Sequence, residues 1–529
     1  MVLVVVALFA MSAAIQAPAT APATPSASEA EATETPDASL AESTQVPDQD
    51  PRLTLQTRVL VFDSSNVKIA VSSNRPSVQW ILRDVAGATL DSGDTPTARG
   101  AASIDFDGLD SGYYGISISV DEGRLIKDTS FAVLHPLHPA NNPLFAASDH
   151  LRTQPDQVEI YSYLGIFAVR FDITWSTVER AKGEYTFDPA RDAKVQAIID
   201  QGLRPLVILD YRNGFYDDNR TPSSPEAIAA FADYAAAVAE HYGTAADYEV
   251  YNEFDVGYND GACGRTADCY LQLLKPTYNA IKAAAPDARV VGPATARIDL
   301  GWLSRLIELG GLEYLDVVSV HTYDYPKPPE GRGEAKLKQL KALLRQHGDK
   351  PLWVTEYGWS TSRSVTDAMQ AKYLVRGSVL LRVAGATRMF VYDLIEDGTA
   401  QGERQHHFGI VRNAGDGLRS LAPKQAYVSY AVMARMLEGV RYVGAGKVGT
   451  GTHAYEFRGG GKPTTFVLWS TAAKSVRVST EAPVTVTSML GATSTYDPQN
   501  GSVDLQLDDR PVYVSGDGIT GVSGVPMAG

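Results

Sequence analysis

Two carboxylates at the ends of apolar, strand-like runs are the side chains of this sequence best suited to do chemistry. The run YEVYNE (248–253) ends in Glu253, and the run LWVTEYG (352–358) carries Glu356. In a (β/α)₈ barrel the carboxyl ends of all strands meet at one mouth, so these two side chains would face a common cleft. Two carboxylates about 5–5.5 Å apart can cleave a glycosidic bond with retention, one as acid/base and one as nucleophile.

Eight strand-like runs alternate with Ala-rich helical stretches between residues 136 and 438, which is typical of parallel βα units. The predicted strands are 145–148, 165–172, 204–211, 248–253, 289–295, 316–323, 351–358 and 388–394. Eight units in order close a barrel. The sequence therefore predicts an α/β fold in which a (β/α)₈ TIM barrel holds Glu253 on its fourth strand and Glu356 on its seventh.

Three further polar side chains are predicted near these carboxylates. Arg170 ends the second predicted strand, where its charge-assisted hydrogen bonds would keep a nucleophilic carboxylate ionised; the alternative is an ion pair with Asp172. His321 and Tyr323 share one face of the sixth strand, because strand side chains alternate with a period of two. We expect them to hydrogen-bond the nucleophile or sugar hydroxyls.

Several aromatic residues lie on or just past predicted strand ends, where their faces could stack on the C–H faces of sugars. Each of them alone could equally be packing. As substrate-binding residues the sequence predicts Trp175, Tyr211, Trp359 and Tyr392, with Tyr258 in a similar position.

Short alternating runs separated by turns flank the barrel on both sides. Five such runs at 52–135 predict an N-terminal β-sandwich, and six at 439–516 predict a C-terminal one. Residues 517–529 follow as a Gly- and Val-containing tail. The predicted architecture is a TIM barrel between two β-sandwich domains.

The first 51 residues differ in composition from the rest. Residues 2–10 form a short apolar run followed by small residues, which predicts a signal peptide (1–17) although no Lys or Arg precedes Arg52. Residues 18–51 are rich in Ala, Pro, Thr, Ser and acids and predict a disordered linker. We therefore expect export to the periplasm or the extracellular space. Retention of the apolar run as a weak membrane anchor is the alternative.

Composition limits the classes of partner. The net charge is −15 and no basic block occurs, so a nucleic-acid partner is not expected. No clustered His/Asp ligand set supports a metal-dependent hydrolase. The sequence does not predict an oligomeric state.

The two cysteines, Cys263 and Cys269, lie six positions apart. In an exported protein we expect them to form a disulfide that closes a tight loop after Glu253. Two unpaired thiols are the alternative.

Residues 145–435 resemble the clan A glycoside hydrolases, and within the clan family 39 and related bacterial exopolysaccharide hydrolases. The resemblance rests on ITWSTVERAKGEYTFD, QGLRPLVILDY, Asn-Glu at 252–253, VTEYGWST, and HFGIVR with LAPKQAYVSYAVM near the end of the barrel. It implies that Glu253 is the acid/base and Glu356 the nucleophile. It further implies that Asn252 binds the 2-hydroxyl, with Arg170, His321 and Tyr323 in support. The resemblance implies neither a metal nor an organic cofactor.

We therefore expect a retaining glycoside hydrolase acting by double displacement on an extracellular or cell-envelope polysaccharide, within the chain rather than from its end. Two alternatives stay open. One is an exo-acting glycosidase such as a β-xylosidase on oligosaccharides. The other is a non-catalytic polysaccharide-binding protein built on a hydrolase barrel.

Overall fold

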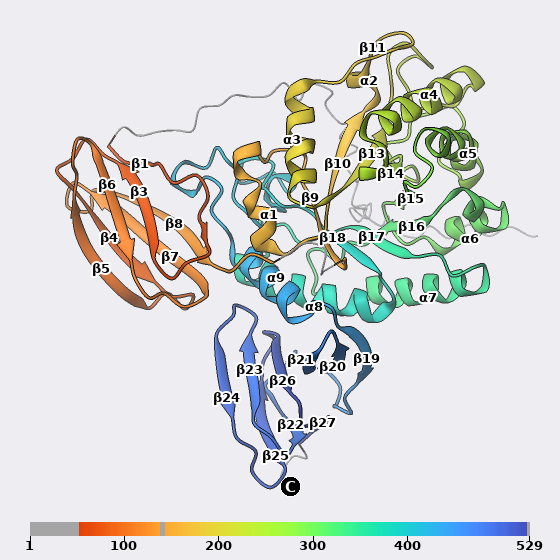
Figure 1. The fold of residues 1–529 in the computed structure, drawn as a ribbon. Helices are drawn as coiled ribbons and strands as arrows, with labels where there is room; N and C mark the ends of the chain where they lie inside the picture. The colour runs from red at the N-terminus through yellow and green to blue at the C-terminus, as the bar shows by residue number, and fades with distance from the viewer. Residues whose placement is uncertain (1–51, 138–142, 526–529) are drawn as a thin grey trace, which may run out of the picture. The chain divides into compact units, whose positions relative to one another are not determined.

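The computed structural model describes residues 52–137 and 143–525 (Figure 1). The predicted signal peptide (1–17) and linker (18–51) lie outside the described residues. Within those residues, no helix combines the length and the apolar character needed to cross a membrane.

The predicted (β/α)₈ barrel is confirmed. Its eight parallel strands follow one another in chain order, and the first, β9, pairs with both β10 and β18 and so closes the ring. The strands are β9 (Phe145–Ser148), β10 (Ala168–Thr174), β13 (Arg204–Asp210), β14 (Asp247–Val250), β15 (Val290–Thr295), β16 (Val317–His321), β17 (Leu352–Tyr357) and β18 (Arg388–Val391). Their carboxyl ends meet at one mouth, where the candidate residues lie.

Helices cover the outside of the barrel between successive strands (Figure 1). They are α1 (Glu159–Leu164), α3 (Pro189–Asp200), α4 (Pro225–Tyr242), α5 (Ala267–Ala284), α6 (Leu300–Glu308), α7 (Arg332–Gln346), α8 (Asp367–Ala384) and α9 (Gln425–Met436). Side chains satisfy the free amides at several N-termini: the Ser224 hydroxyl accepts from the amide of Ala227, and the Thr366 hydroxyl from that of Met369. These caps fix where each helix begins after its strand-end loop.

The N-terminal domain is a β-sandwich with its own apolar core. Its sheets have the strand orders β1-β3-β6 and β2-β8-β7-β4-β5. The strands are β1 (Thr54–Leu55), β2 (Val61–Phe62), β3 (Val67–Ser72), β4 (Ser77–Arg83), β5 (Thr89–Pro96), β6 (Ala101–Phe106), β7 (Gly112–Val120) and β8 (Leu125–Val133). The sequence predicted five strands. Because β5 is an edge strand with no buried residue, it lacks the apolar alternation that would have shown it.

The C-terminal β-domain extends past the predicted boundary at 516. Its sheets have the orders β19-β20-β21-β26-β23-β24 and β25-β22-β27. The strands are β19 (Arg441–Ala445), β20 (Thr452–Gly459), β21 (Lys462–Ser470), β22 (Lys474–Thr480), β23 (Val484–Ser488), β24 (Thr493–Tyr496), β25 (Ser502–Leu507), β26 (Val512–Gly516) and β27 (Ile519–Gly524). Strand β27 pairs with β22, so six residues of the predicted tail (517–529) are part of the sheet; the four glycines and one proline of this segment concealed the strand in the sequence.

A buried ion pair joins the barrel to the C-terminal sheet. Arg376 on α8 is 2% exposed, and its guanidinium donates two hydrogen bonds to Glu330, including Nε to Oε1 at 2.7 Å. The indole N–H of Trp469 on β21 donates to the same Oε1 at 2.9 Å. A buried charge is stable only while it is paired, so this contact is costly to break on one side.

We predict that Glu330→Ala lowers the free energy of unfolding by about 3 kcal/mol, because Arg376 stays buried with only the more distant Asp509 carboxylate, at 4.0 Å, to balance its charge. Glu334→Ala is the matched control: Glu334 pairs with Lys338 one helical turn away on an exposed face, and its loss should cost under about 0.5 kcal/mol. Urea unfolding of both variants measures the difference. Equal losses would show that the Glu330 pair contributes no more than a surface pair.

Candidate active site

Arg170 connects three of the predicted site residues. It is 2% exposed, and its Nη1 donates to Glu356 Oε1 at 2.7 Å while its Nη2 donates to Asn252 Oδ1 at 2.8 Å. Its Nε donates to Glu249 Oε2 at 2.6 Å, a fully buried carboxylate that the sequence did not single out. Arg170 therefore holds the proposed nucleophile, as the first alternative predicted, and its second ion pair is with Glu249 and not with Asp172.

The strand ends differ slightly from the predicted ones. Strand β10 continues to Thr174, so Arg170 is its third residue and points into the barrel from below the mouth. Strand β16 ends at His321, and Tyr323 lies in the loop beyond it. The Tyr323 hydroxyl nevertheless donates to Glu356 Oε2 at 2.6 Å, as the expected role requires.

His321 lies between the two carboxylates. Its Nδ1 is 2.9 Å from Glu253 Oε1 and 3.5 Å from Glu356 Oε2, and the nearest oxygens of the two carboxylates lie within 4.8 Å of each other. Burial alone would lower the pKa of His321, but the charge of Glu356 and the hydrogen bond to Glu253 outweigh burial and raise it, so Nδ1, which faces both carboxylates, carries a proton. His321 thus donates to Glu253 Oε1.

Glu356 has the environment of an anion that stays charged. Burial alone would raise its pKa, but the charges of His321 and Arg170, with the hydrogen bonds from Tyr323 and Arg170, outweigh burial and hold the pKa below its ordinary value. A lowered pKa keeps the carboxylate ionised over the pH range in which most enzymes work.

We predict that Tyr323→Phe moves the acidic limb of the kcat/KM profile to higher pH. The substitution removes one hydrogen bond to the charged form of Glu356, so its pKa rises and a larger fraction is protonated at low pH. Loss of a hydrogen bond to a charged group should also lower kcat/KM at the optimum by about 10- to 100-fold. Tyr442→Phe on β19 is the control. An unmoved acidic limb would contradict the assignment.

Asn252 has a fixed orientation. Its Oδ1 accepts from Arg170, so its Nδ2 is the donor, and one Nδ2 hydrogen goes to the Tyr211 hydroxyl at 2.9 Å. The other can reach a sugar hydroxyl. The backbone beside it is unusual for L-residues, with φ of 65° at Tyr251 and 50° at Glu253. Such conformations cost about 1–3 kcal/mol each and occur mainly where the surrounding structure fixes a functional side chain.

The predicted aromatic residues divide into two groups. Tyr211 and Tyr392 are partly exposed near the carboxylates, and Tyr392 packs edge-on against Tyr323, with ring centroids 6.3 Å apart. Trp175 and Trp359 are 0% and 3% exposed. The indole N–H of Trp175 donates to Glu179 and that of Trp359 to the carbonyl of Lys327. The expectation that these two tryptophans bind substrate is wrong: both are packed in the interior.

Polar side chains that follow β9 and β18 lie close together at the mouth of the barrel, and the sequence analysis did not predict this cluster. His150, Asp393 and Asp397 each place one donor or acceptor atom within 4.8 Å of the others. His150 Nε2 lies 3.3 Å from the Tyr392 hydroxyl and its Nδ1 3.3 Å from Asp172 Oδ2. The only signal was position: His150 and Asp393 each follow a strand by two residues. We refer to His150, Tyr392, Asp393 and Asp397 as the β9/β18 wall.

Two groups of side chains could in principle bind a metal ion, namely Glu253, His321 and Glu356, and His150, Asp393 and Asp397. In both groups a carboxylate is already paired with an arginine. In one, the Glu356 carboxylate is already paired with Arg170, and in the other Arg152 pairs with Asp397 at 2.8 Å. These side chains balance one another's charge.

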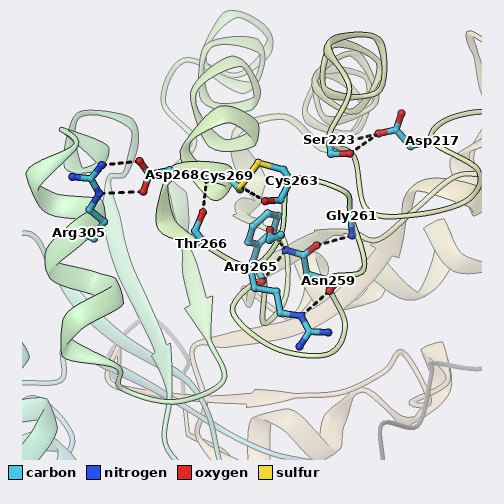
Figure 2. The surroundings of a disulfide bond; sticks show 12 residues. Asp217, Ser223, Asn259, Gly261, Cys263, Arg265, Thr266, Asp268, Cys269 and Arg305 are labelled. Atoms are coloured by element: carbon cyan, nitrogen blue, oxygen red, sulfur yellow. Dashed lines mark hydrogen bonds and ion pairs between the residues drawn. A yellow bond between two sulfur atoms is a disulfide. The ribbon is translucent and has the colours of Figure 1, made fainter.

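A disulfide joins Cys263, in the loop that follows Glu253, to Cys269 in the first turn of α5 (Figure 2). The loop is also held by Asn259, 2% exposed, whose side-chain N–H groups donate to the carbonyls of Phe254 and Gly264 at 3.1 and 2.8 Å. The Arg265 Nε in turn donates to the Asn259 carbonyl at 2.9 Å. The same loop carries Tyr258, whose ring lies 6.0 Å from that of Tyr211. The disulfide therefore shapes the side of the mouth next to the proposed acid/base.

We predict that Cys263→Ser/Cys269→Ser lowers the free energy of unfolding by about 2 kcal/mol, because the closed loop is short. We also expect KM to rise more than kcat falls, since the loop carrying Tyr258 becomes looser while the carboxylates stay in place. Thermal unfolding and steady-state kinetics measure the two effects. Two alkylatable thiols in the non-reduced wild-type protein would contradict the pairing.

Comparison with known proteins decides the kind of site. Residues 146–379 match the family model for cellulase, glycosyl hydrolase family 5. The barrel is that of a clan A glycoside hydrolase. The glycosidase shares its fold with a family 39 glycoside hydrolase from Bacteroides cellulosilyticus WH2, at 22% identity and a TM-score of 0.75 over 88% of this chain and 99% of that one.

Two further structures have the same fold at lower similarity. A family 39 β-xylosidase from Caulobacter crescentus is 17% identical, with a TM-score of 0.53 over 72% of this chain and 96% of that one. A glucosidase from Croceicoccus marinus is 13% identical, with a TM-score of 0.53 over 74% and 98%. No curated protein sequence matches the chain. The expected resemblance to clan A, and in fold to family 39, is confirmed.

Proposed function

We propose that this glycosidase cleaves O-glycosidic bonds of an extracellular or cell-envelope polysaccharide with retention of anomeric configuration. The observation that carries the proposal is the approach of Glu253 and Glu356 within 4.8 Å, with Arg170 bound to Glu356 alone of the two. Retaining glycosidases need such a short separation, because the second carboxylate attacks the sugar directly and no water molecule fits between.

The arrangement assigns each carboxylate one role in each step. In the first step Glu356 attacks the anomeric carbon while Glu253 protonates the leaving oxygen, so that a glycosyl ester forms on Glu356. In the second step Glu253, now ionised, removes a proton from water, the water attacks the same carbon, and Glu356 leaves as a carboxylate. In this proposal His321 donates to Glu253 Oε1 throughout, and we expect Asn252 Nδ2 to donate to the 2-hydroxyl.

The polymeric substrate is proposed from the expected export and from the β-domains on both sides of the barrel. An exo-acting glycosidase, such as a β-xylosidase on oligosaccharides, is the second candidate. One contact favours it: Arg152 after β9 and Asp397 after β18 form an ion pair at 2.8 Å, which joins two mouth loops. Two joined loops at this position would close the sugar-binding site on one side. Following chain length during polymer hydrolysis separates the two, since endo action yields oligosaccharides early and exo action releases only small products.

We predict different kinetic defects for the two carboxylates. Glu356→Gln should lower kcat by at least about 10⁴-fold on every substrate, since no covalent intermediate forms. Glu253→Gln should spare the first step for aryl glycosides with acidic leaving groups, so that a burst of aryl alcohol precedes a slow steady state. Glu438→Gln, whose side chain pairs with Lys462 in the C-terminal part, is the control.

Proton NMR of the first product settles the stereochemistry. We expect the released sugar to appear first with the anomeric configuration of the substrate. Inversion would contradict the roles given to both carboxylates. Binding of a polysaccharide without any hydrolysis would favour the non-catalytic alternative, although a binding protein has no need of an ionised carboxylate held by a buried arginine.

A further inference from the structure

Two neighbouring residues at the end of β14 point to opposite sides of the barrel mouth. Asn252 is turned towards β10 and β13, because its Oδ1 accepts from Arg170 at 2.8 Å and its Nδ2 donates to the Tyr211 hydroxyl at 2.9 Å. Glu253 is turned towards β16, because its Oε1 lies 2.9 Å from His321 Nδ1. In the ring of strands, β14 has β13 on one side and β15, followed by β16, on the other.

This divergence gives the bound substrate a direction. In the proposed reaction the sugar attacked by Glu356 has its 2-hydroxyl at Asn252, and the oxygen that leaves has to reach the Glu253 carboxyl to take its proton. The leaving group therefore lies on the β15 and β16 side of the mouth, while the attacked sugar lies on the β10 and β13 side. A side chain that recognises the leaving sugar has to come from the loops after β14, β15 or β16.

Asp255 lies on that side of the mouth, next to the end of β15. Its Oδ1 accepts from the amide of Ala296, the residue that follows β15, at 2.9 Å. The loop is also held two residues earlier, where the Glu253 amide donates to the carbonyl of Ala294 at 3.0 Å. Asp255 is partly exposed, and no other residue within 52–137 and 143–525 donates a hydrogen bond to its carboxyl group. Its second oxygen is therefore available to a ligand.

Asp255 is also close to the proposed acid/base. Burial raises its pKa, and the hydrogen bond from the Ala296 amide opposes that rise. The charge of Glu253 raises the pKa further, whereas the charge of His321 lowers it, so both site residues are near enough to act on this carboxyl group. Protonated or not, a carboxyl group has an oxygen that accepts from a sugar hydroxyl, and the protonated form donates as well. Recognition of a hydroxyl group therefore does not depend on the charge of Asp255.

We propose that Asp255 binds a hydroxyl group of the leaving sugar, and so makes the enzyme selective for bonds between two sugars over bonds to alcohols without further hydroxyl groups. The inference rests on the proposed function and adds a specificity-determining residue on the leaving-group side of the same site. A hydrogen bond from the leaving sugar to Asp255 also holds the leaving oxygen beside Glu253, where the proton is delivered.

The test compares two leaving groups on the same attacked sugar. Wild type and Asp255→Ala are assayed on a disaccharide and on the cyclohexyl glycoside of the sugar that the wild type hydrolyses best. Both leaving oxygens need the proton of Glu253, but only the disaccharide has hydroxyl groups on the leaving side. We expect Asp255→Ala to lower the ratio of kcat/KM for the disaccharide to kcat/KM for the cyclohexyl glycoside by at least about tenfold, since a hydrogen bond to the leaving sugar is lost.

Asp316→Ala is the matched control. Asp316 accepts from the Val290 amide at 2.8 Å at the opposite end of β15, so its loss should leave the ratio unchanged. Melting temperatures show which variants fold. If Asp255→Ala does not fold, Asp255→Asn keeps an acceptor for the Ala296 amide and should lower the ratio by about fivefold.

The ratio separates the inference from the proposed function. An unchanged ratio in a folded Asp255 variant, including an equal loss on both substrates, would show that Asp255 acts through Glu253 or not at all, and would overturn the inference while leaving the glycosidase intact. A wild type that hydrolyses no glycoside and no polysaccharide would overturn the proposed function and the inference with it.

Discussion

The sharing of Arg170 between Glu249 and Glu356 is the interaction on which the site depends. A buried guanidinium is stable only when its charge and its donors are satisfied, and here they are satisfied by β14 and β17 together. Glu249 balances part of the guanidinium charge from inside the barrel, while Glu356 stays accessible from the mouth of the barrel. The same guanidinium orients the Asn252 amide. One residue thus fixes the nucleophile, its ionisation and the donor beside it.

The barrel makes this arrangement possible because its strands converge. Residues from β10, β14, β16 and β17 are far apart in the sequence, yet adjacent strand ends bring their side chains within hydrogen-bond distance. The local backbone is adapted at a cost: Tyr251 and Glu253 adopt positive φ values that disfavour ordinary side chains. The contacts of the buried Tyr251 hydroxyl with Thr221, and of the Glu253 amide with the Ala294 carbonyl, hold that conformation.

Much of the fold and the centre of the site could be predicted from the sequence. The barrel strands have continuous apolar runs because both faces are buried, and Glu253 and Glu356 end such runs. Edge strands such as β5 and β24 were missed because they have no buried face and hence no alternation. Trp175 and Trp359 follow strands as sugar-binding tryptophans would, but position along a chain does not tell whether a ring points to the mouth or into the packing. Glu249 and the members of the β9/β18 wall other than Tyr392 could not be found, since their roles depend on which side chains of distant strands meet.

Mass spectrometry of a trapped intermediate tests the central claim most directly, which is that Glu356 is the anion that attacks. A 2-deoxy-2-fluoro glycosyl fluoride of the sugar that the enzyme hydrolyses best slows the second step more than the first, so the glycosyl ester should accumulate. The account predicts a mass increase of one fluorosugar per chain, located by peptide mapping on Glu356 and absent from Glu356→Gln. A label on Glu253, or turnover of the active enzyme with no ester at all, would contradict it.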